Sequence, residues 1–232
     1  MIDFDGLQDL GIQIDREARE RLAAFHGLLL EQNQKMDLTN VPEEEMTLRH
    51  YADSLLPISH GLVPERARVM DIGSGAGFPG LVIAAVLPGV RMTLMDARQK
   101  RCAFLQTAVA LMGLENTEIL CSRAENLAVP PYREGYDLAL ARAVAPLNVL
   151  SEYLLPYVKV GGEALCWKGP NVTQELAPGR RAARILGAEF GPLVNLGIPE
   201  RSHLIQVINK VSPTPKQYPR KAGMPNKEPL GG

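Results

Sequence analysis

The stretch DIGSGAGFPG, residues 71–80, offers the clearest ligand chemistry in this chain. Its last three glycines, Gly75, Gly77 and Gly80, match G-x-G-x-x-G, the pattern that binds a dinucleotide pyrophosphate at a helix N-terminus. Counted from Gly73 instead, the pattern is G-x-G-x-G, and it follows directly on an aspartate and an isoleucine. The two interpretations imply different cofactors, because only the first one requires a phosphate on the ligand.

Two features of this loop argue against a dinucleotide. A pyrophosphate-binding helix would begin near Ala76, which places Pro79, a residue without an N–H, in its first turns. Asp71 would add a negative charge beside the phosphates. S-adenosylmethionine has no phosphate and carries an ammonium and a sulfonium, so a nearby carboxylate favours its binding. The loop therefore predicts this cofactor, with the glycine backbone against its methionine moiety and a helix that begins at Pro79.

Two later segments fit the rest of that cofactor. Asp96 ends the next predicted strand, where a carboxylate can accept hydrogen bonds from both ribose hydroxyls. In CSRAENL, after the third predicted strand, Ala124 and Glu125 fall where an adenine ring would lie against the backbone. The order of these segments predicts a methyltransferase. An NAD(P)-dependent oxidoreductase is supported only by the G-x-G-x-x-G match.

The sequence constrains the identity of the methylated atom only through the catalytic motifs that are absent from it. VPPY at 129–132 resembles the tetrad used for adenine amino groups, but it begins with Val and precedes the fourth predicted strand. Methylation at cytosine C5 needs a thiolate, and Cys166 lies in an apolar strand without a preceding Pro. A purine ring nitrogen such as N7 has its own lone pair and needs mainly alignment and charge stabilisation. This negative argument is compatible with N7 and does not identify it.

The elements that must position these residues indicate an α/β fold. From about residue 66, strands alternate with segments of helix length, which is typical of a parallel sheet with helices on both faces. Strands are predicted at 67–72, 91–96, 117–121, 136–142, 162–168, 189–196 and 203–209, and helices at 79–87, 98–112, 146–158 and 172–187. The last two strands have no helix between them and can pair antiparallel at one edge. We therefore expect a Rossmann-like class I S-adenosylmethionine-dependent methyltransferase fold with a mostly parallel seven-stranded sheet and an antiparallel edge strand.

Helices are also predicted before this region. One spans 15–36, where Asp15 can serve as the N-cap and apolar residues recur at helical spacing. A second one spans 42–56, with three glutamates in its first turn, and Pro57 is expected to close it. Both helices precede the first strand and can either shape the docking of a substrate or cover one sheet edge.

Three segments follow from these elements. We expect residues 1–60 to form a helical extension packed on the main domain and residues 61–210 to form the methyltransferase domain. Residues 211–232 form a basic tail with too many Pro and Gly for regular structure, so it is either disordered or laid over the surface.

Composition sets further bounds. Of the 232 residues, 46% are hydrophobic and 22% are charged, which is ordinary for a globular domain. The apolar runs are too short to span a bilayer and the acidic N-terminus is unlike a signal peptide, so we expect a cytoplasmic protein without a membrane partner. Three widely spaced cysteines predict buried thiols rather than a disulfide or a metal site. The net charge is −1, yet residues 210–232 hold five cations and one carboxylate, which weakly indicates a polyanionic partner.

Eight segments along nearly the whole chain share their order with a known family. They are NQKMDLTNV (33–41), RHYADSLLP (49–57), DIGSGAGFPG (71–80), KRCAFL (100–105), SRAEN (122–126), ARAVAPL (141–147), WKGP (167–170) and RSHLIQVINK (201–210). With them the chain resembles the glucose-inhibited division protein B family, also called ribosomal small-subunit methyltransferase G. RH-x-x-DS together with G-x-G-x-G-F-P-G is specific to this family. The ending TPKQYPRKAGMPNKEPL is similar to its Gram-positive-type tail.

The resemblance implies methylation at N7 of one guanine in the 530 loop of 16S rRNA, position 527 in standard rRNA numbering. It implies S-adenosyl-L-methionine as the cofactor and, as the partner, 16S rRNA in the 30S subunit or an assembly intermediate. Carried over by position, the cofactor-binding residues are Gly73, Phe78, Ala124, Glu125 and Arg142, with Gly75 and Gly77 forming the loop. Asp96 is added by the ribose argument above. The residues alone predict a methyltransferase without fixing its substrate.

Basic residues in the shared segments and near the predicted strand ends are candidates for RNA contact. They are Arg49, His50, Arg123, Lys168 and Arg201. Such phosphate contacts, and any made by the tail lysines, weaken with added salt. A structural alternative pairs Arg49 with Asp53 at i,i+4 on one helix. His50 is a poor candidate for a general base.

Two further functional classes stay open at this point. A small-molecule methyltransferase would need a closed apolar pocket and no basic surface. A noncatalytic ribosome-binding protein could retain the cofactor fold without its activity. We expect a monomer, and no residue of the sequence identifies a proton acceptor.

Overall fold

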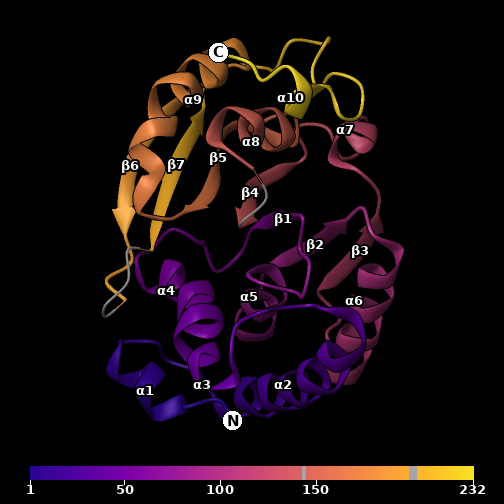
Figure 1. The fold of residues 1–232 in the computed structure, drawn as a ribbon, viewed down its shortest axis with the longest axis vertical. Helices are drawn as coiled ribbons and strands as arrows, with labels where there is room; N and C mark the ends of the chain where they lie inside the picture. Colours follow the sequence, from indigo (N-terminus) through magenta and orange to yellow (C-terminus); the bar gives the residue numbers. More distant parts are fainter. Residues whose placement is uncertain (143–144, 199–202) are drawn as a thin grey trace.

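A seven-stranded sheet organises the computed structural model, which describes residues 1–142, 145–198 and 203–232 (Figure 1). The strands are β1 (Arg68–Ile72), β2 (Arg91–Asp96), β3 (Thr117–Cys121), β4 (Tyr136–Arg142), β5 (Val158–Lys168), β6 (Ala188–Asn195) and β7 (Leu204–Lys210), in the order β3-β2-β1-β4-β5-β7-β6. β1 to β5 pair in parallel, and β7 runs antiparallel to β5 and β6. The predicted fold class is confirmed, and the reversed strand lies one position inside the edge.

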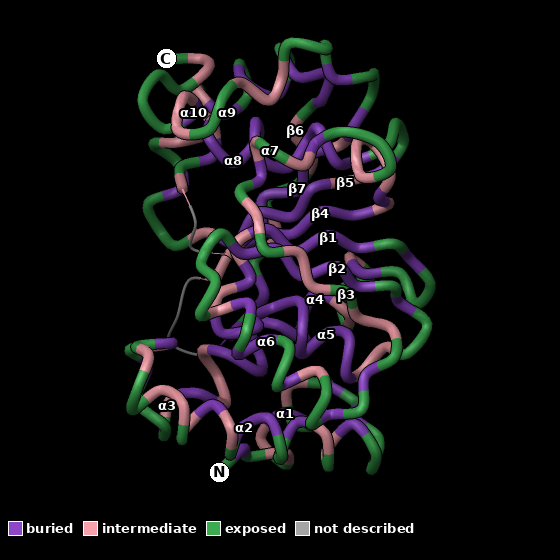
Figure 2. Tube along the Cα trace, turned by 90° about the vertical axis from the view of Figure 1, so that its right-hand side faces the viewer, coloured by how far each residue is buried: buried purple, intermediate pink, exposed green. Residues whose placement is uncertain are grey.

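Helices cover both faces of the sheet (Figures 1 and 2). They are α1 (Phe4–Asp9), α2 (Arg16–Met36), α3 (Glu43–Met46), the π-helix η1 (Thr47–Ala52), α4 (Asp53–Ser59), α5 (Gly80–Val86), α6 (Gln99–Met112), α7 (Ala124–Leu127), α8 (Leu147–Leu154), the 3-10 helix η2 (Pro170–Val172), α9 (Thr173–Ile185) and α10 (Met224–Lys227). Successive residues of β4 alternate between two cores, as a pleated strand requires. Leu138 and Leu140 pack with α2, α4, α5 and α6, whereas Ala139 and Ala141 pack with α8 and α9.

The first predicted helix is confirmed as α2. The Asp15 carboxylate accepts a hydrogen bond from the Ala18 backbone N–H at 2.7 Å and caps the helix. Leu22, Phe25 and Leu29 are buried on one face of α2 and join the core with the sheet. The N-terminal residues therefore share a core with the seven-stranded sheet, while the division into three segments stays a prediction.

The second predicted helix is wrong in two respects. Residues 43–59 form α3, η1 and α4 in succession, and Pro57 lies inside α4 instead of closing it. Pro57 cannot donate to the Asp53 carbonyl, its i−4 partner in an α-helix. The indole Nε1–H of Trp167 donates to that carbonyl at 3.0 Å, so the acceptor is satisfied and the helix continues.

Smaller differences have local causes. α8 ends at Leu154 rather than near residue 158, because Pro156 restricts the residue before it and cannot continue the helix. β5 begins correspondingly early, at Val158. Cys102 and Cys166 are buried as expected, but Cys121 is exposed at the end of the outer strand β3, which corrects the prediction of three buried thiols.

The basic tail is laid over the surface. It passes over α8 and forms α10, which is drawn in yellow in Figure 1. Arg133 donates to the carbonyls of Thr214 and Tyr218, both at 2.8 Å. Lys210 is fully buried and pairs with Glu134 at 2.9 Å, so it is not available for a phosphate contact.

Candidate functional site

The glycine loop follows β1 directly and has the backbone that glycine permits. Gly73, Gly75 and Gly77 have φ values of 78°, 56° and 94°, in the left-handed region that disfavours other residues. The following helix, α5, begins at Gly80 with Pro79 as its N-cap. This start is four residues after the one that a pyrophosphate-binding helix requires and within one residue of the start predicted for S-adenosylmethionine.

Asp71 lies beneath this loop and is buried. Its Oδ2 accepts a hydrogen bond from the Gly80 N–H at 3.1 Å, whereas Oδ1 has no hydrogen-bond partner among the described residues. A Cβ on Gly80 would lie 2.6 Å from the same Oδ2, so this approach requires glycine. Burial raises the pKa of Asp71 to about 7. A bound cation would favour its ionised form.

Asp96, at the end of β2, joins the loop to the start of α6. Its Oδ2 accepts from the Gly75 N–H at 3.0 Å and its Oδ1 accepts from the Arg98 N–H at 2.8 Å. Each carboxylate oxygen has a further lone pair. The carboxylate is thus held in a fixed orientation, and its contact with a ribose stays a prediction.

Ala124 and Glu125 begin α7, after β3. The Ala124 carbonyl accepts from the Tyr157 hydroxyl at 2.5 Å. The Glu125 carboxylate is buried, accepts from the Gly223 N–H at 2.8 Å and lies 3.3 Å from Arg123. The Glu125 side chain therefore faces the C-terminal tail, while its backbone stays on the predicted adenine side.

A cleft of about 1260 Å³ opens beside the loop, at the carboxyl ends of β1, β4 and β5. Seven predicted site residues line it: Arg49, His50, Gly73, Gly75, Phe78, Arg142 and Lys168. Five others do not: Gly77, Asp96, Arg123, Ala124 and Glu125. Arg201 lies outside the described residues. The cleft lies where the connections from β1 and β4 diverge to opposite sides of the sheet, the usual ligand site of such folds.

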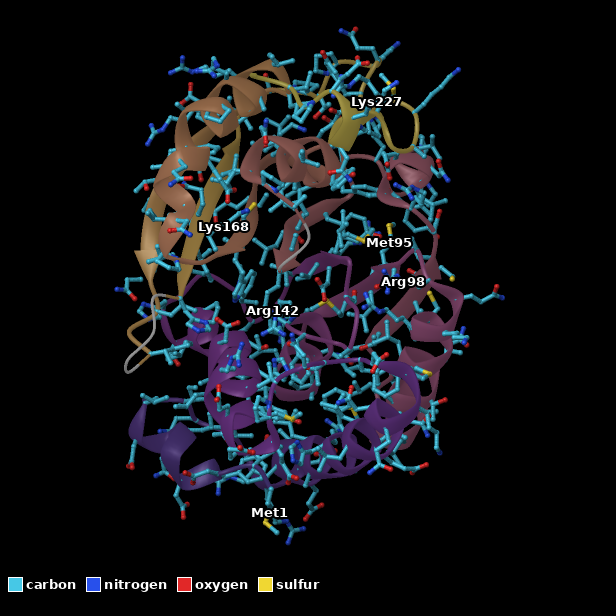
Figure 3. All side chains as sticks on the ribbon, in the orientation of Figure 1. Met1, Met95, Arg98, Arg142, Lys168 and Lys227 are labelled. Atoms are coloured by element: carbon cyan, nitrogen blue, oxygen red, sulfur yellow. The ribbon has the colours of Figure 1, made fainter. Side chains whose placement is uncertain are left out.

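Arg142 ends β4 and ties the cleft floor to the N-terminal helices. Its Nη1 donates to the Arg49 carbonyl at 3.0 Å and to Asp53 Oδ2 at 2.9 Å, and its Nη2 donates to His50 Nδ1 at 3.1 Å. The guanidinium also lies over the Phe78 ring, 5.3 Å from its centroid. Figure 3 shows Arg142 at the middle of the molecule, where these elements meet.

The predicted pair of Arg49 with Asp53 is wrong. Arg49 pairs instead with Glu45, at 3.0 Å, one turn earlier on the partly exposed surface. Asp53 points inward and binds Arg142, because the π-turn of η1 changes which side chains share a helix face.

His50 is neutral and structural in this geometry. Arg142 can only donate, so His50 Nδ1 accepts and its Nε2–H donates to Thr39 Oγ1 at 2.8 Å. Burial and the charge of Arg142 lower the pKa of His50 to about 3. The imidazole also stacks on Phe78, with ring centroids 4.3 Å apart. A role as general base would require the loss of one of these hydrogen bonds.

Lys168 is also engaged by the protein. Its ammonium donates to the Ala145 carbonyl and to Glu175, both at 2.7 Å. Glu175 accepts in turn from the Leu147 N–H at 2.7 Å. Lys168 therefore fixes Ala145 and, through Glu175, the start of α8 at Leu147 against α9, and its side chain is only 9% exposed.

Sequence reasoning missed the roles of four residues in this network, which are Thr39, Asp53, Trp167 and His203. The His203 ring lies 2.7 Å from Asp53 through Nδ1, and Trp167 holds the Asp53 carbonyl. Thr39 Oγ1 accepts the hydrogen bond from His50 Nε2–H and a second one from the Val41 N–H at 3.1 Å. All four lie in quoted segments: DLTN, RH-x-x-DS, WKGP and RSHL. The shared order of these segments could have suggested that the four residues lie close together, but spacing along the chain did not predict which of them form hydrogen bonds.

Known proteins identify the family. The family model described as rRNA small subunit methyltransferase G matches residues 18–204. A ribosomal RNA small subunit methyltransferase G from Alkaliphilus oremlandii (strain OhILAs) is 42% identical over 97% of this chain and 96% of its own length. One from Alkaliphilus metalliredigens (strain QYMF) is 41% identical over 99% and 98% of the two chains. The chain belongs to this family.

A solved structure agrees with the fold of this rRNA small subunit methyltransferase G family member. A mutant of MtNAS in complex with S-adenosylmethionine has a TM-score of 0.55 at 15% identity, covering 84% of this chain and 76% of that one. At this identity the similarity shows the fold alone. Within the described ranges, no helix has the length and apolar composition to cross a membrane, and no cluster of His, Cys, Asp or Glu is arranged for a metal ion.

The chain is therefore a methyltransferase, and S-adenosylmethionine is its cofactor. The residues present fit that molecule. The left-handed glycines leave room at the loop, and Asp71 has a buried oxygen without a partner beneath it. The late start of α5 offers no cradle for a pyrophosphate.

Proposed function

We propose that the protein methylates N7 of one guanine in the 530 loop of 16S rRNA, at position 527 in standard rRNA numbering. The observation that carries this proposal is the charge of the cleft beside the glycine loop. Among the described residues, five cations line it, Arg49, Arg98, Arg101, Arg142 and Lys168, against the two carboxylates Asp37 and Asp53. A cationic open cleft suits a polyanion, and the family relatives are named as methyltransferases of small-subunit rRNA. The proposed place of action is the cytoplasm, where small ribosomal subunits are found.

The predicted cofactor residues form three groups along the sheet edge. Gly73, Gly75 and Gly77 allow close backbone approach to the methionine moiety, and Asp71 lies beneath them. Asp96 is oriented to accept from the ribose, and the 124–125 segment lies on the adenine side. Phe78, held between His50 and Arg142, forms an apolar wall. When bound, S-adenosylmethionine supplies a methyl group on a positively charged sulfur.

The side chains of the cleft suit a nucleophile that brings its own lone pair. Guanine N7 carries no proton, so no general base is needed at the reacting atom. The two histidines among the described lining residues, His50 and His203, are both hydrogen-bonded to protein groups. The cleft therefore supplies alignment and an electrostatic environment.

The five predicted RNA-contact residues divide into two kinds. Arg49 and Arg123 keep partly exposed guanidinium groups, with 33% and 48% of their side chains accessible. We assign these two, with the exposed Arg98, to RNA phosphates. We assign His50 and Lys168 to positioning, since their polar atoms bond to protein groups. Arg201 stays a proposed phosphate contact.

The test is transfer of a labelled methyl group to 30S subunits isolated from a strain that lacks the modification. Label should appear in 16S rRNA, and chain cleavage specific for 7-methylguanine should map it to position 527. Subunits from a strain with the modification serve as the control and should accept no label. Label on another nucleotide would overturn the assigned site, and no label with saturating cofactor would overturn the proposed activity.

A further inference from the structure

The C-terminal strap, residues 211–232, reaches the cofactor side of the sheet from the opposite end of the chain. It passes over α8, and Figure 1 shows α10 beside α8 and near α7. Its first part is fixed by Arg133, which holds the Thr214 and Tyr218 carbonyls, and by Lys210, which donates to Thr214 Oγ1 at 2.7 Å. The strap is thus a constrained segment when it arrives at α8.

Arg220 clamps the middle of the strap to α8. Its Nη2 lies 2.6 Å from Glu152 Oε2, and its Nε and backbone N–H donate to Oε1 at 2.9 and 2.8 Å. Glu152 is completely buried, so this carboxylate depends on Arg220 for compensation of its charge. Arg220, one of the tail's cations, therefore binds protein rather than RNA.

Three residues later the strap touches the adenine-side segment. The Gly223 N–H donates to Glu125 Oε1 at 2.8 Å, and Gly223 has a φ of 87°, a conformation that glycine permits. α7 has only four residues and no side-chain cap, so its own hydrogen bonds cannot hold it rigidly. Tyr157 holds the Ala124 carbonyl, and the strap holds the neighbouring side chain.

We infer that the strap is a positioning element of the cofactor site, in which Arg220 and Gly223 fix the 124–125 segment for the adenine of S-adenosylmethionine. This inference rests on the adenine placement given in the proposed function. A pre-formed adenine side avoids the cost of ordering this segment on binding. Loss of the strap contact should therefore change the affinity for the cofactor more than the affinity for RNA.

The test measures cofactor binding by calorimetry in two matched pairs of variants. Glu125→Ala removes the acceptor for the Gly223 N–H, whereas Glu125→Gln retains a side-chain oxygen there. A chain that ends at Pro219 and carries Glu152→Gln lacks the clamp and Gly223, whereas a chain that ends at Lys227 keeps both. We expect about tenfold weaker binding for Glu125→Ala and for the chain ending at Pro219, a smaller loss for Glu125→Gln, and less than about twofold change for the chain ending at Lys227.

A combined variant separates positioning from general destabilisation. Glu125→Ala in the chain that ends at Pro219 should bind no more weakly than either change alone, because both remove the same contact. Each variant should lose the same factor in affinity for 5′-methylthioadenosine as for S-adenosylmethionine, because 5′-methylthioadenosine has the adenosine part without the amino acid. With 30S subunits, KM for the cofactor should rise by a larger factor than KM for the subunit changes.

Several outcomes overturn the inference. These are wild-type affinity in Glu125→Ala, additive losses in the combined variant, or an equal loss in the chain ending at Lys227. Glu125→Ala leaves the Arg220–Glu152 clamp intact, so the question is answered even if the shorter chain fails to fold. If the wild-type chain binds the cofactor but does not label 30S subunits, the proposed function fails while this inference is still tested by binding alone.

Discussion

The two ends of the cofactor site are built from different parts of the chain. At the methionine end, the loop amides of Gly80 and Gly75 bond to Asp71 and Asp96, residues 9 and 21 positions away. At the adenine end, Ala124 and Glu125 are held from 33 and 98 positions away, by Tyr157 and Gly223. A compact sequence motif can thus specify one end, whereas the other needs the folded sheet and the tail. Substitutions at the two ends should therefore have separable effects.

The largest effect is expected from Arg142→Ala, behind the methionine end. Asp53 is buried, and without Arg142 its carboxylate keeps His203 as its one ion-pair partner among the described residues. We expect the free energy of unfolding to fall by about 3–5 kcal/mol, the usual cost of leaving a buried ion pair without one partner. Urea unfolding monitored by circular dichroism measures this value.

Arg49→Ala is the matched control for that substitution. Arg49 binds Arg142 only through its backbone carbonyl, and its guanidinium pairs with Glu45 on the surface. Its removal should change stability by less than about 1 kcal/mol. Equal losses in the two variants would show that Arg142 does not organise this region.

Asp96→Ala should have the next largest effect, on binding rather than on folding. The ribose loses a charged acceptor and the Gly75 amide loses its partner, so affinity for S-adenosylmethionine should weaken by about 1–3 kcal/mol. Calorimetry measures the change, and Asp96→Asn, which keeps one acceptor oxygen, should retain part of the affinity. Unchanged affinity in Asp96→Ala would mean that the ribose lies elsewhere.

The same variant sharpens the comparison between the two ends. Asp96 and Glu125 share no hydrogen-bond partner among the described residues. The losses for Asp96→Ala and Glu125→Ala should therefore add within about 0.5 kcal/mol in the double variant. A larger deviation would show that the two ends are coupled through the cofactor or the sheet.

The methionine end should also respond to pH through Asp71. Burial raises the pKa of this carboxyl to about 7, so the group is protonated below pH 7 and ionised above it. A cationic ligand favours the ionised form, so affinity should fall as pH decreases below 7, by up to about tenfold per pH unit. Calorimetry from pH 5.5 to 8 tests this, with Asp71→Asn expected to flatten the profile. A flat wild-type profile would contradict it.

Most elements were predictable because their signals are local. The predicted strands 91–96, 117–121 and 136–142 are confirmed residue for residue, since short apolar runs bounded by turn residues mark strand ends over short distances. Three glycines, which are left-handed in the structure, and a nearby carboxylate likewise predicted the loop and its cofactor. These features depend on residues within one turn or one strand of each other.

Several features that were not predicted share a different cause, which is a partner far away in sequence. Pro57 does not end α4, because Trp167 satisfies the carbonyl that proline leaves open. The hydrogen bonds of Arg142 to η1 and α4 were not predicted, because these elements lie some 90 positions earlier. The tail cation Arg220 looked available to RNA, yet Glu152 holds it. Spacing along the chain carries no information about such partners.

The smallest effect is expected from Arg98→Ala. The Arg98 side chain lies at the exposed part of the cleft, and neither end of the cofactor site depends on it. Arg98 lines the cleft, and only its backbone N–H contacts Asp96. Arg98→Ala should leave cofactor affinity unchanged and raise KM for the 30S subunit a few-fold. The slope of log affinity against log salt should fall by about 0.7, the value for one phosphate contact to single-stranded RNA. Arg16→Ala, an exposed cation on α2 that does not line the cleft, is the control and should change neither value. An unchanged salt slope for Arg98→Ala would place the RNA phosphates on another surface, whereas a loss of cofactor affinity would show that the exposed rim and the methionine end act as one unit.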